Sequence, residues 1–562
     1  MIETPAADRR STPVASLVRG WFACIAAAVA CIAVPLDAQA VMGIGEQVLG
    51  PPRGVVRVTI APSFETFDER FLPDGETEPL GARLTTPALG ASVFPAITGT
   101  SAAVRTLSGS PGFEGSLGIS SLRASTSVNT LRLGAELGLT DRLSLMASVP
   151  LVRARTELQL DVNGAGGNLG INPALLDPDL AVFNQGALDA QNAAWSALDA
   201  LIATCTAPGA TDGRCPEVQA NLTTLQALSA DATAAAAASA ALYSPDAPFA
   251  PVQGGSADAA IAARLDALAA AFAAWPTLGL PLFPGAVFAP AEGPIGSQEA
   301  PAVLGDPAFG IGIDSLVARS RFGVGDIEVG MRLLLLDSPG RERRLSPGGM
   351  HVRLAVTGGA RLGTGEAPDA DQPFDPGTGD GQTDLIGAAH LDLLFGGRFW
   401  TTISGRYVRQ LEDRQTMRIA PPWLALAPLA SRHEVERDLG DYIELEVAPR
   451  IVLGRYLSIG ARYAMRDKEA DRHTLATGAE LPPEGLPFEA EVLDSATAYT
   501  VQELGVGFTY STMAAKARGL ARLPIEVTYQ HVESLSASDG YVPKRRRDEV
   551  RIRVYLSVFG GR

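Results

Sequence analysis

The chain has 562 residues, of which 46% are hydrophobic and 6% aromatic, and its formal net charge at pH 7 is −16. A chain this acidic is not expected to bind nucleic acid, because nucleic-acid-binding surfaces are basic. No stretch after Ala40 holds about 18 consecutive uncharged apolar residues, so no transmembrane helix is predicted beyond the N-terminal leader.

The first residues of the chain have the features of a secretory leader. Arginines precede an apolar run over 21–34, and Ala38-Gln39-Ala40 fits the small-x-small rule for cleavage. We therefore expect a signal peptide over 1–40, with cleavage after Ala40.

Residues 130–151 carry the clearest structural pattern. Leu131, Leu133 and Leu137 alternate with polar residues and glycines, Thr140-Asp141-Arg142 forms a turn, and the alternation resumes over 143–151. A period of two predicts strands that are apolar on one face only. Runs of about ten residues, repeated between turns in an exported chain, are typical of a transmembrane β-barrel.

The same pattern predicts an all-β fold, a closed antiparallel barrel of about twelve strands with both chain ends in the periplasm. The predicted strands run near 54–65, 127–139, 142–158, 323–336, 350–362, 383–395, 398–411, 441–453, 455–467, 499–511, 521–533 and 548–559. Long outer loops are expected over 68–126, 363–384 and 419–440, with weak strand character near 82–93. The side chains expected to face lipid include Leu133, Ile327, Leu391, Ile459, Val527 and Val554.

Residues 164–310 break this pattern, because they are rich in Ala, Pro and Asp and have a helical period. The first predicted helix carries an apolar stripe of Leu188, Trp195, Leu198, Ile202 and Cys205. A second helix starts near Pro216, and a third starts near Ser256 and stops at Pro276. We expect barrel strands over 41–163, an extracellular helical insertion over 164–310, and the remaining strands over 311–562. The insertion would cap the barrel mouth, plug the lumen or project as an appendage, and its stripes are also explained as the core of a small helical subdomain.

Two cysteines, Cys205 and Cys215, remain after the leader is removed. In an oxidising envelope compartment their spacing predicts a local disulfide that closes a helix–helix turn, with two free thiols as the alternative. No histidine pair accompanies them, so the sequence predicts no metal site and no cofactor.

Four short motifs occur in an order that resembles a known family. They are GLTDRLSL at 138–145 ahead of Val149-Pro150, FGVGDIEVG at 322–330, RLGTG at 361–365 and GTGDG at 377–381. Together they resemble the outer-membrane family labelled MetA-pathway of phenol degradation, over roughly 127–158 and 320–559. The resemblance implies a barrel of about twelve strands and passage of aromatic or other hydrophobic small molecules. It implies no catalytic residues, and the helical insertion departs from the family pattern.

The face of the strands that should point into the barrel is strongly charged. The predicted lumen-lining residues are Arg132, Glu136, Glu328, Arg332, Arg353, Asp392, Arg406, Glu444, Glu446, Arg450, Arg462, Arg466, Glu526, Arg551 and Arg553. Glu444 and Glu446 should face Arg466 and Arg462, with Arg462 opposite Val447 across the turn at 454–455, and Glu526 should face Arg551 and Arg553. These charges form either a salt-bridged filling that stabilises the barrel or a charged constriction that selects permeants.

The sequence therefore favours an outer-membrane channel or transporter for small, hydrophobic or aromatic molecules. A structural or surface-display barrel that anchors the helical insertion is the alternative. An outer-membrane hydrolase is not favoured, because no nucleophile constellation is present. The expected partners are outer-membrane lipid, the barrel-assembly machinery and a small-molecule permeant that the sequence does not identify.

Overall fold

The computed structural model describes residues 44–314, 316–338, 349–396, 398–454, 456–478, 486–517 and 519–557. The predicted signal peptide over 1–40 lies outside this part of the chain. None of the described helices is long and apolar enough to cross a membrane.

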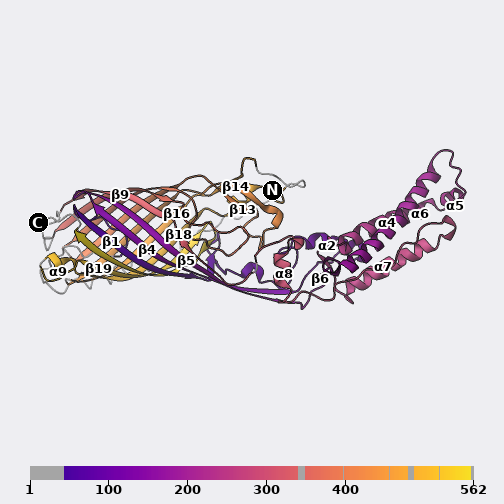
Figure 1. Cartoon of the computed structure of the whole chain (residues 1–562), viewed down its shortest axis with the longest axis horizontal. Coiled ribbons are helices and arrows are strands. Elements are labelled where there is room, and N and C mark those ends of the chain that lie inside the picture. Colours follow the sequence, from indigo (N-terminus) through magenta and orange to yellow (C-terminus); the bar gives the residue numbers. More distant parts are fainter. Residues whose placement is uncertain are drawn as a thin grey trace, which may run out of the picture.

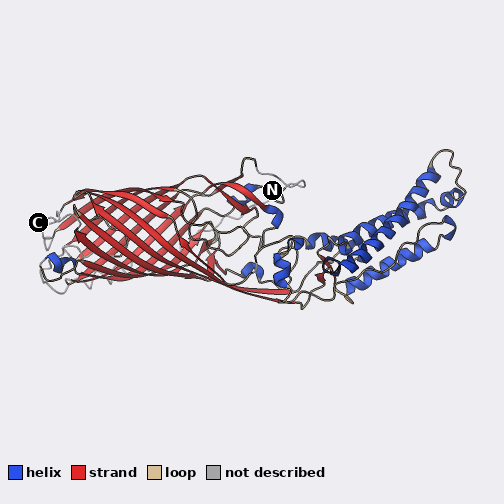
Figure 2. Ribbon diagram, viewed as in Figure 1, coloured by secondary structure: helices blue, strands red, loops and turns tan. Residues whose placement is uncertain are grey.

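One end of the molecule is a closed antiparallel barrel (Figures 1 and 2). Its strands are β1 (Val55–Phe67), β4 (Ile119–Gly138), β5 (Leu143–Asn163), β8 (Arg319–Val324), β9 (Ile327–Asp337), β10 (Met350–Leu362), β11 (Asp384–Phe395), β12 (Phe399–Gln410), β15 (Tyr442–Leu453), β16 (Leu457–Lys468), β18 (Tyr499–Ser511), β19 (Ile525–Ser538) and β21 (Arg546–Ser557). Each strand pairs with its neighbours in the chain, and the first strand, β1, also pairs with the last, β21, which closes the ring. Since β8 and β9 both pair with β5 and continue one another, the barrel has twelve strand positions, as predicted.

The outer surface of the ring is apolar. Leu133, Ile459 and Val506 are 40–54% exposed on the outside, while the residues between them along each strand turn inward. A closed ring leaves no backbone group unpaired in lipid, and the apolar belt meets the acyl chains. The chain is thus a barrel of the kind that spans the bacterial outer membrane.

The fourth strand of the barrel is interrupted at Gly325-Asp326, between β8 and β9. Asp326 turns away from strand geometry, and its carboxylate accepts hydrogen bonds from the backbone N–H groups of Gly365 (2.9 Å) and Asp380 (3.1 Å). These two residues belong to the loop between β10 and β11. The acidic residue therefore ties that loop against the barrel wall at the break.

The two ends of the barrel differ. At one end, the turn end, the strands are joined by short connections such as 139–142 and by the short helix α9 (Met513–Ala517). The other end is the loop end. The loop end carries three additional small elements of sheet. They are β2 (Glu69–Phe71), β3 (Thr77–Pro79) and β20 (Val542–Pro543); β13 (Asp413–Arg418), β14 (Arg432–Asp438) and β17 (Arg472–Leu475); and β6 (Leu169–Ile171) with β7 (Phe249–Pro251).

Two predicted loops contain regular structure that alternation did not indicate. The weak strand character near 82–93 was wrong: the chain there forms the 3-10 turn η1 (Ala82–Leu84) and a single bridge from Thr86 to Ser120. The helix α2 (Ile97–Ser108) follows, and β14 lies inside the predicted loop 419–440. Four 3-10 segments complete the described elements: η2 (Pro276–Leu278), η3 (Pro307–Phe309), η4 (Leu429–Ser431) and η5 (Ala490–Asp494). Short helices and edge strands such as these are stabilised by contacts with distant segments, so local sequence predicts them poorly.

The helical segment projects from the loop end as a long tower (Figures 1 and 2). It consists of α3 (Pro173–Leu176), α4 (Pro178–Thr206), α5 (Cys215–Ala220), α6 (Leu222–Tyr243) and α7 (Ser256–Ala273), with α8 (Ala300–Gly305) near its base. Helices α4 to α7 lie away from the lumen, so the tower is an appendage and not a plug. The predicted third helix is α7, and its N-cap residue is Gly255 instead of the expected Ser256.

The tower has the seam of a coiled coil. Core residues of α4 and α6 recur at alternating intervals of three and four: Asn184, Leu188, Gln191, Trp195, Leu198, Ile202 and Cys205 on α4, and Leu225, Leu228, Ala232, Ala235, Ser239 and Leu242 on α6. This spacing places one stripe of each helix against its neighbour. Trp195 completes the predicted stripe of α4 but stays partly exposed at its edge.

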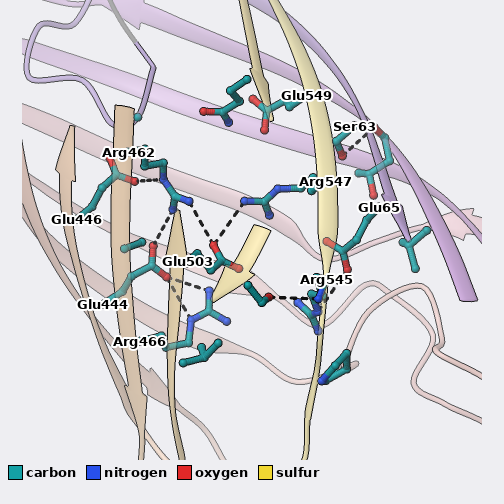
Figure 3. A pocket seen from close by; sticks show the side chains of 18 of the residues that line it. Ser63, Glu65, Glu444, Glu446, Arg462, Arg466, Glu503, Arg545, Arg547 and Glu549 are labelled. Carbon is teal, nitrogen blue, oxygen red and sulfur yellow. Dashed lines mark hydrogen bonds and ion pairs between the residues drawn. The ribbon is translucent and has the colours of Figure 1, made fainter. Parts of the chain in front are cut away.

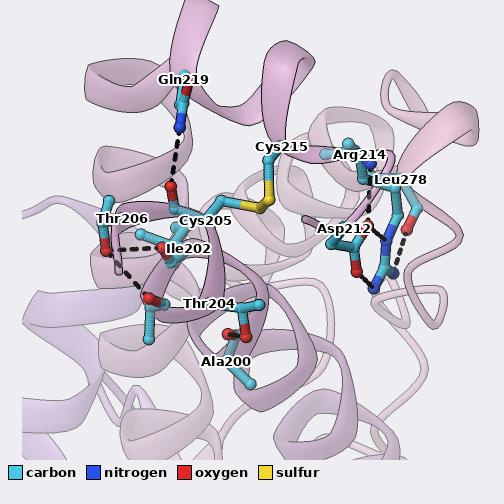
Figure 4. Close-up of a disulfide and its surroundings, with 11 residues drawn as sticks. Ala200, Ile202, Thr204, Cys205, Thr206, Asp212, Arg214, Cys215, Gln219 and Leu278 are labelled. Carbon is cyan, nitrogen blue, oxygen red and sulfur yellow. Dashed lines mark hydrogen bonds and ion pairs between the residues drawn. A yellow bond between two sulfur atoms is a disulfide. The ribbon is translucent and has the colours of Figure 1, made fainter. Parts of the chain in front are cut away.

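A disulfide joins Cys205 at the end of α4 to Cys215 at the start of α5 (Figure 4), as predicted. Both cysteines are buried in the tower core. In the connecting segment, hydrogen bonds from Arg214 lower the pKa of Asp212 to about 2. The same guanidinium donates a hydrogen bond to the carbonyl of Leu278 (3.1 Å), which ties the connection to the segment after α7.

Candidate functional site: the barrel lumen

The inward face of the barrel strands carries the charges, because this face does not meet lipid. A first cluster lies near the turn end, where Arg57 of β1 forms an ion pair with Glu136 of β4. Ser144 donates a hydrogen bond to the same carboxylate, and Arg332 lies 3.9 Å from it. Buried charges of this kind need partners, and here they obtain them from neighbouring strands.

Two more ion pairs lie along β21 in the lumen. Arg553 of β21 donates a hydrogen bond to Glu526 of β19 (2.7 Å), and the register places these residues directly opposite each other. The expectation that Arg551 would also face Glu526 was wrong. Arg551 pairs with Glu549 on its own strand (2.7 Å), because it stands opposite Thr528.

A tryptophan separates two arginines at the same end of the barrel. The guanidinium groups of Arg450 and Arg353 lie 5.0 and 5.9 Å from the ring centre of Trp400, so the ring is within the range of a cation–π contact from both. Arg353 also donates a hydrogen bond to Asp337 (3.0 Å), while Arg450 lies 3.8 Å from Asp392. The arginines are less than 10% exposed, so these side chains largely fill the turn-end half.

The loop-end half contains a ladder of alternating charges (Figure 3). Arg462 of β16 donates hydrogen bonds to Glu446 of β15 (2.6 Å) and to Glu503 of β18 (3.2 Å). Four residues further along β16, on the same face of the strand, Arg466 donates a hydrogen bond to Glu444 (2.9 Å). The pairs therefore join three adjacent strands across the lumen surface.

The register of this hairpin differs by one residue from the predicted one. Glu444 stands directly opposite Arg466, and Val447 stands opposite Tyr463 and not Arg462. A shift of one residue relative to the partner changes which side chains are opposite, but both arginines are long enough to reach the same two carboxylates. Arg406 of β12 continues the charged surface and lies 3.4 Å from Glu328 of β9.

The chain segment before β1 runs inside the barrel. This lumen segment, residues 44–50, contacts the wall at several points: Glu46 N–H donates to Glu446 (2.7 Å), and Arg551 donates to the carbonyl of Gly45 (3.2 Å). The side-chain oxygen of Gln47 accepts a hydrogen bond from Arg57 (2.7 Å). Val48 is buried with two wall residues. The segment thus narrows the lumen at mid-barrel.

A cavity of about 490 Å³ remains between the lumen segment and the loop end. Its wall combines ion-paired arginines and glutamates with Arg132, Glu46, Tyr499 and Tyr541. This volume is within the range of small-molecule sites. The cavity brings together seven of the predicted lumen residues: Arg132, Arg406, Glu444, Glu446, Arg462, Arg466 and Arg551.

No pattern in the sequence indicates the lumen segment. Its residues have neither a strand nor a helix period, and nothing local distinguishes a peptide inside a barrel from a linker. The pair of Arg57 with Glu136 was not predicted either, because the long loop 68–118 between β1 and β4 leaves their register undetermined by any local pattern.

Comparisons with known proteins concern the fold. No family model matches the sequence, and no curated protein matches it. Among solved structures, a COG4313 outer membrane channel from Pseudomonas putida F1 matches 93% of this chain with 100% of its own, at 10% identity and a TM-score of 0.38. The Pseudomonas putida toluene transporter TodX matches 90% of both chains at 9% identity and a TM-score of 0.22. A Pseudomonas aeruginosa FadL homologue matches 90% of both chains at 8% identity and a TM-score of 0.24. Similarities of this size do not identify a permeant.

Proposed function

We propose that the protein is an outer-membrane channel for small molecules, whose lumen is constricted by residues 44–50. The observation that carries this proposal is the cavity of about 490 Å³ beside the lumen segment, inside a closed barrel. A barrel needed only as an anchor has no reason to keep a charged cavity, since interior space of this size costs packing contacts. The long loops and the tower then lie on the extracellular side, as in other outer-membrane barrels.

The lumen segment is suited to act as a gate. It is held by the burial of Val48 and by individual hydrogen bonds: Glu46 N–H donates to Glu446, Arg551 to the carbonyl of Gly45, Arg57 to Gln47 and to the carbonyl of Leu49, and Gln47 to Glu526. Individual hydrogen bonds contribute on the order of 1 kcal/mol net, so a permeant that competes for them can displace the peptide. A continuous strand of the wall could not move so easily, because its backbone is paired on both sides.

The resemblance to the MetA-pathway family suggests aromatic or other hydrophobic permeants. The solved structures that match include a toluene transporter, and we extend the same class of permeant to this chain as part of the proposal. The family assignment itself rests on the four sequence motifs. We propose no catalytic role, and we expect outer-membrane lipid and the barrel-assembly machinery as partners.

Surface display is the second candidate function, and the tower favours it. Helices α4, α6 and α7 form a buried core together with α2, carry a disulfide, and project far from the barrel (Figure 1). Such a tower does not line the lumen and would serve contact with other molecules. The two functions are compatible, but only the first requires passage through the barrel.

Reconstitution of the purified full-length protein in planar lipid bilayers tests the proposal. We expect single-channel currents in potassium chloride, and a several-fold larger conductance after deletion of residues 44–50. A second variant, Arg462→Ala/Arg466→Ala, leaves Glu444 and Glu446 without their arginines and should shift selectivity toward cations. A barrel with the tower residues 178–273 replaced by a short glycine linker serves as the control and should conduct like the intact protein. Absence of current from both the intact protein and the deletion variant would leave surface display as the function.

A further inference from the structure

One arginine of the cavity differs from all the others. The arginines at 406, 462, 466, 545, 547 and 551 each have a carboxylate within 2.6–3.8 Å. Arg132 makes no hydrogen bond or ion pair with any residue in the described part of the chain, and it is exposed to the cavity. An arginine that keeps its five donors free inside a barrel is a ready binding group for an anion.

The strand register explains why Arg132 stays free. On one side it stands opposite Ala61 of β1, and on the other side opposite Pro150 of β5. Neither neighbour has a side chain that can accept a hydrogen bond. Its charge acts on that of Glu549, whose carboxylate is already bound by Arg551. The cavity wall therefore offers a guanidinium with no acceptor of its own.

The lumen segment contributes the complementary group. Glu46 lines the same cavity, and its carboxylate makes no hydrogen bond or ion pair with a described residue. Its charge interacts with His390 and with the charges of Arg332, Arg406 and Arg551. The backbone around it is fixed to the wall by the bonds of Gly45 and Glu46 described above. The lumen segment thus holds a carboxylate among cationic groups at the edge of the cavity.

Part of the cavity lining is less polar. Tyr499, Val501, Tyr541, Val542 and Pro543 line it, at the loop end of β18 and along β20. A ligand in this cavity would place an anionic group near Arg132 and an apolar body against these side chains. Sites for small molecules commonly combine an apolar surface with a few polar groups that fix orientation.

We propose that the lumen cavity binds small carboxylates with an apolar body, such as an aromatic acid, and that the carboxylate of Glu46 competes with them for the cationic groups. This inference rests on the proposed channel function and adds the class of permeant and the means of gating. Binding of the ligand at Arg132 and beside Arg406 and Arg551 removes part of the electrostatic attraction that holds Glu46. The lumen segment is then released, and the constriction opens.

Calorimetric titration of the full-length protein with sodium benzoate tests the site, with benzyl alcohol as the uncharged ligand of similar size. Glu46→Gln removes the competing carboxylate, so benzoate should bind about tenfold more tightly, a change of about 1.4 kcal/mol. Arg132→Gln should weaken binding about tenfold, and Arg132→Lys should restore most of the loss. Arg123→Gln is the matched control, because Arg123 lies on the outward face of the same strand and is exposed. It should leave binding unchanged, and benzyl alcohol should not bind measurably to any variant.

Bilayer recordings on the same samples separate this inference from the channel function. Millimolar benzoate should raise the open probability of the intact protein, and Glu46→Gln should raise it without ligand. If the protein conducts but neither substitution alters benzoate affinity, the carboxylate site is refuted and the channel function stands. If benzoate binds as expected but no current passes, the site stands and the channel function is refuted. Equal binding of benzoate and benzyl alcohol also refutes the carboxylate site.

Discussion

The barrel and the tower pack their side chains in opposite ways. In the barrel, apolar residues such as Leu133 and Ile459 point outward and charged residues such as Glu526 point inward, where Glu526 has no solvent exposure. In the tower, Leu198 and Leu225 are fully buried, and the charged residues lie outside. Each region places apolar side chains where water is absent: lipid surrounds the barrel, and water surrounds the tower.

The same contrast appears in the charge distribution. Residues 164–310 contain thirteen acidic and only two basic residues, a net charge of −11 out of −16 for the whole chain. In the described barrel, arginines and carboxylates are interleaved so that most of them pair within the lumen. Charges in a lumen must neutralise one another at close range, whereas charges on an exposed tower are screened by water and salt. The predictions below test this contrast, beginning with the largest expected effect.

Removal of one partner from a buried barrel pair should have the largest effect. Glu136→Leu leaves Arg57 buried without its carboxylate, so the free energy of unfolding should fall by about 3–5 kcal/mol. Urea titration in detergent, read by heat-modifiable migration on gels, measures the change. Glu157→Leu is the control: it removes the partner of Arg155 from an exposed pair, and its effect should be below about 1 kcal/mol. Equal effects would contradict the distinction between buried and exposed pairs.

A charge on the outer face should be costly on the barrel and harmless on the tower. Val447 is exposed on the lipid-facing side of β15, and Val447→Arg should destabilise the barrel in lipid by about 2–4 kcal/mol. Ala200 is exposed on α4, and Ala200→Arg should change stability by less than about 0.5 kcal/mol. Unfolding titrations in lipid vesicles measure both variants. A harmless Val447→Arg would mean that this face does not meet lipid.

Loss of the disulfide should weaken the tower alone. The bridge closes a short loop, and in the chain-entropy model a loop of this size contributes roughly 2–3 kcal/mol. In Cys205→Ala/Cys215→Ala, the helical circular dichroism signal should melt at a lower temperature, while the barrel keeps its heat-modifiable migration. A parallel loss of barrel stability would show that the two regions unfold as one unit. Thiol titration of the denatured, unreduced wild-type protein should find no free thiol at these two positions.

The smallest expected effect is a gain in the stability of the tower, whereas the preceding substitutions reduce stability. Gln191 is fully buried in the seam between α4 and α6, and neither its side-chain nitrogen nor its oxygen has a described hydrogen-bond partner. Gln191→Leu removes this unpaired amide, so the tower should become more stable by about 1 kcal/mol. Gln185→Leu on the exposed side of the same helix is the control and should be nearly neutral. Destabilisation by Gln191→Leu would indicate that the amide has a partner such as an internal water.

The sequence predicted the strands well because each one follows a strict local rule. Alternation over 441–453 and 455–467 located β15 and β16 to within two residues, and the short turn between them limited the register to an error of one. The helices of the tower also follow a local period, and the cysteines at 205 and 215 are close in the chain. Features of this kind depend on contacts between residues that are close in the chain, so a local sequence pattern is enough to predict them.

Three features were decided only by the tertiary structure, and all three depend on residues far apart in the chain. Pairing of β1 with β4 across the long loop 68–118 created the pair of Arg57 with Glu136. The lumen segment found its partners Glu446 and Arg551 hundreds of residues away. Arg132 became the free arginine of the cavity because the strand register placed it opposite Ala61 on one side and Pro150 on the other. The local periods thus determined the elements and their two faces, because side-chain direction repeats along one strand or helix. The contents of the lumen were determined by which strands the closed ring made neighbours, since ion pairs depend on distances across space and not along the chain.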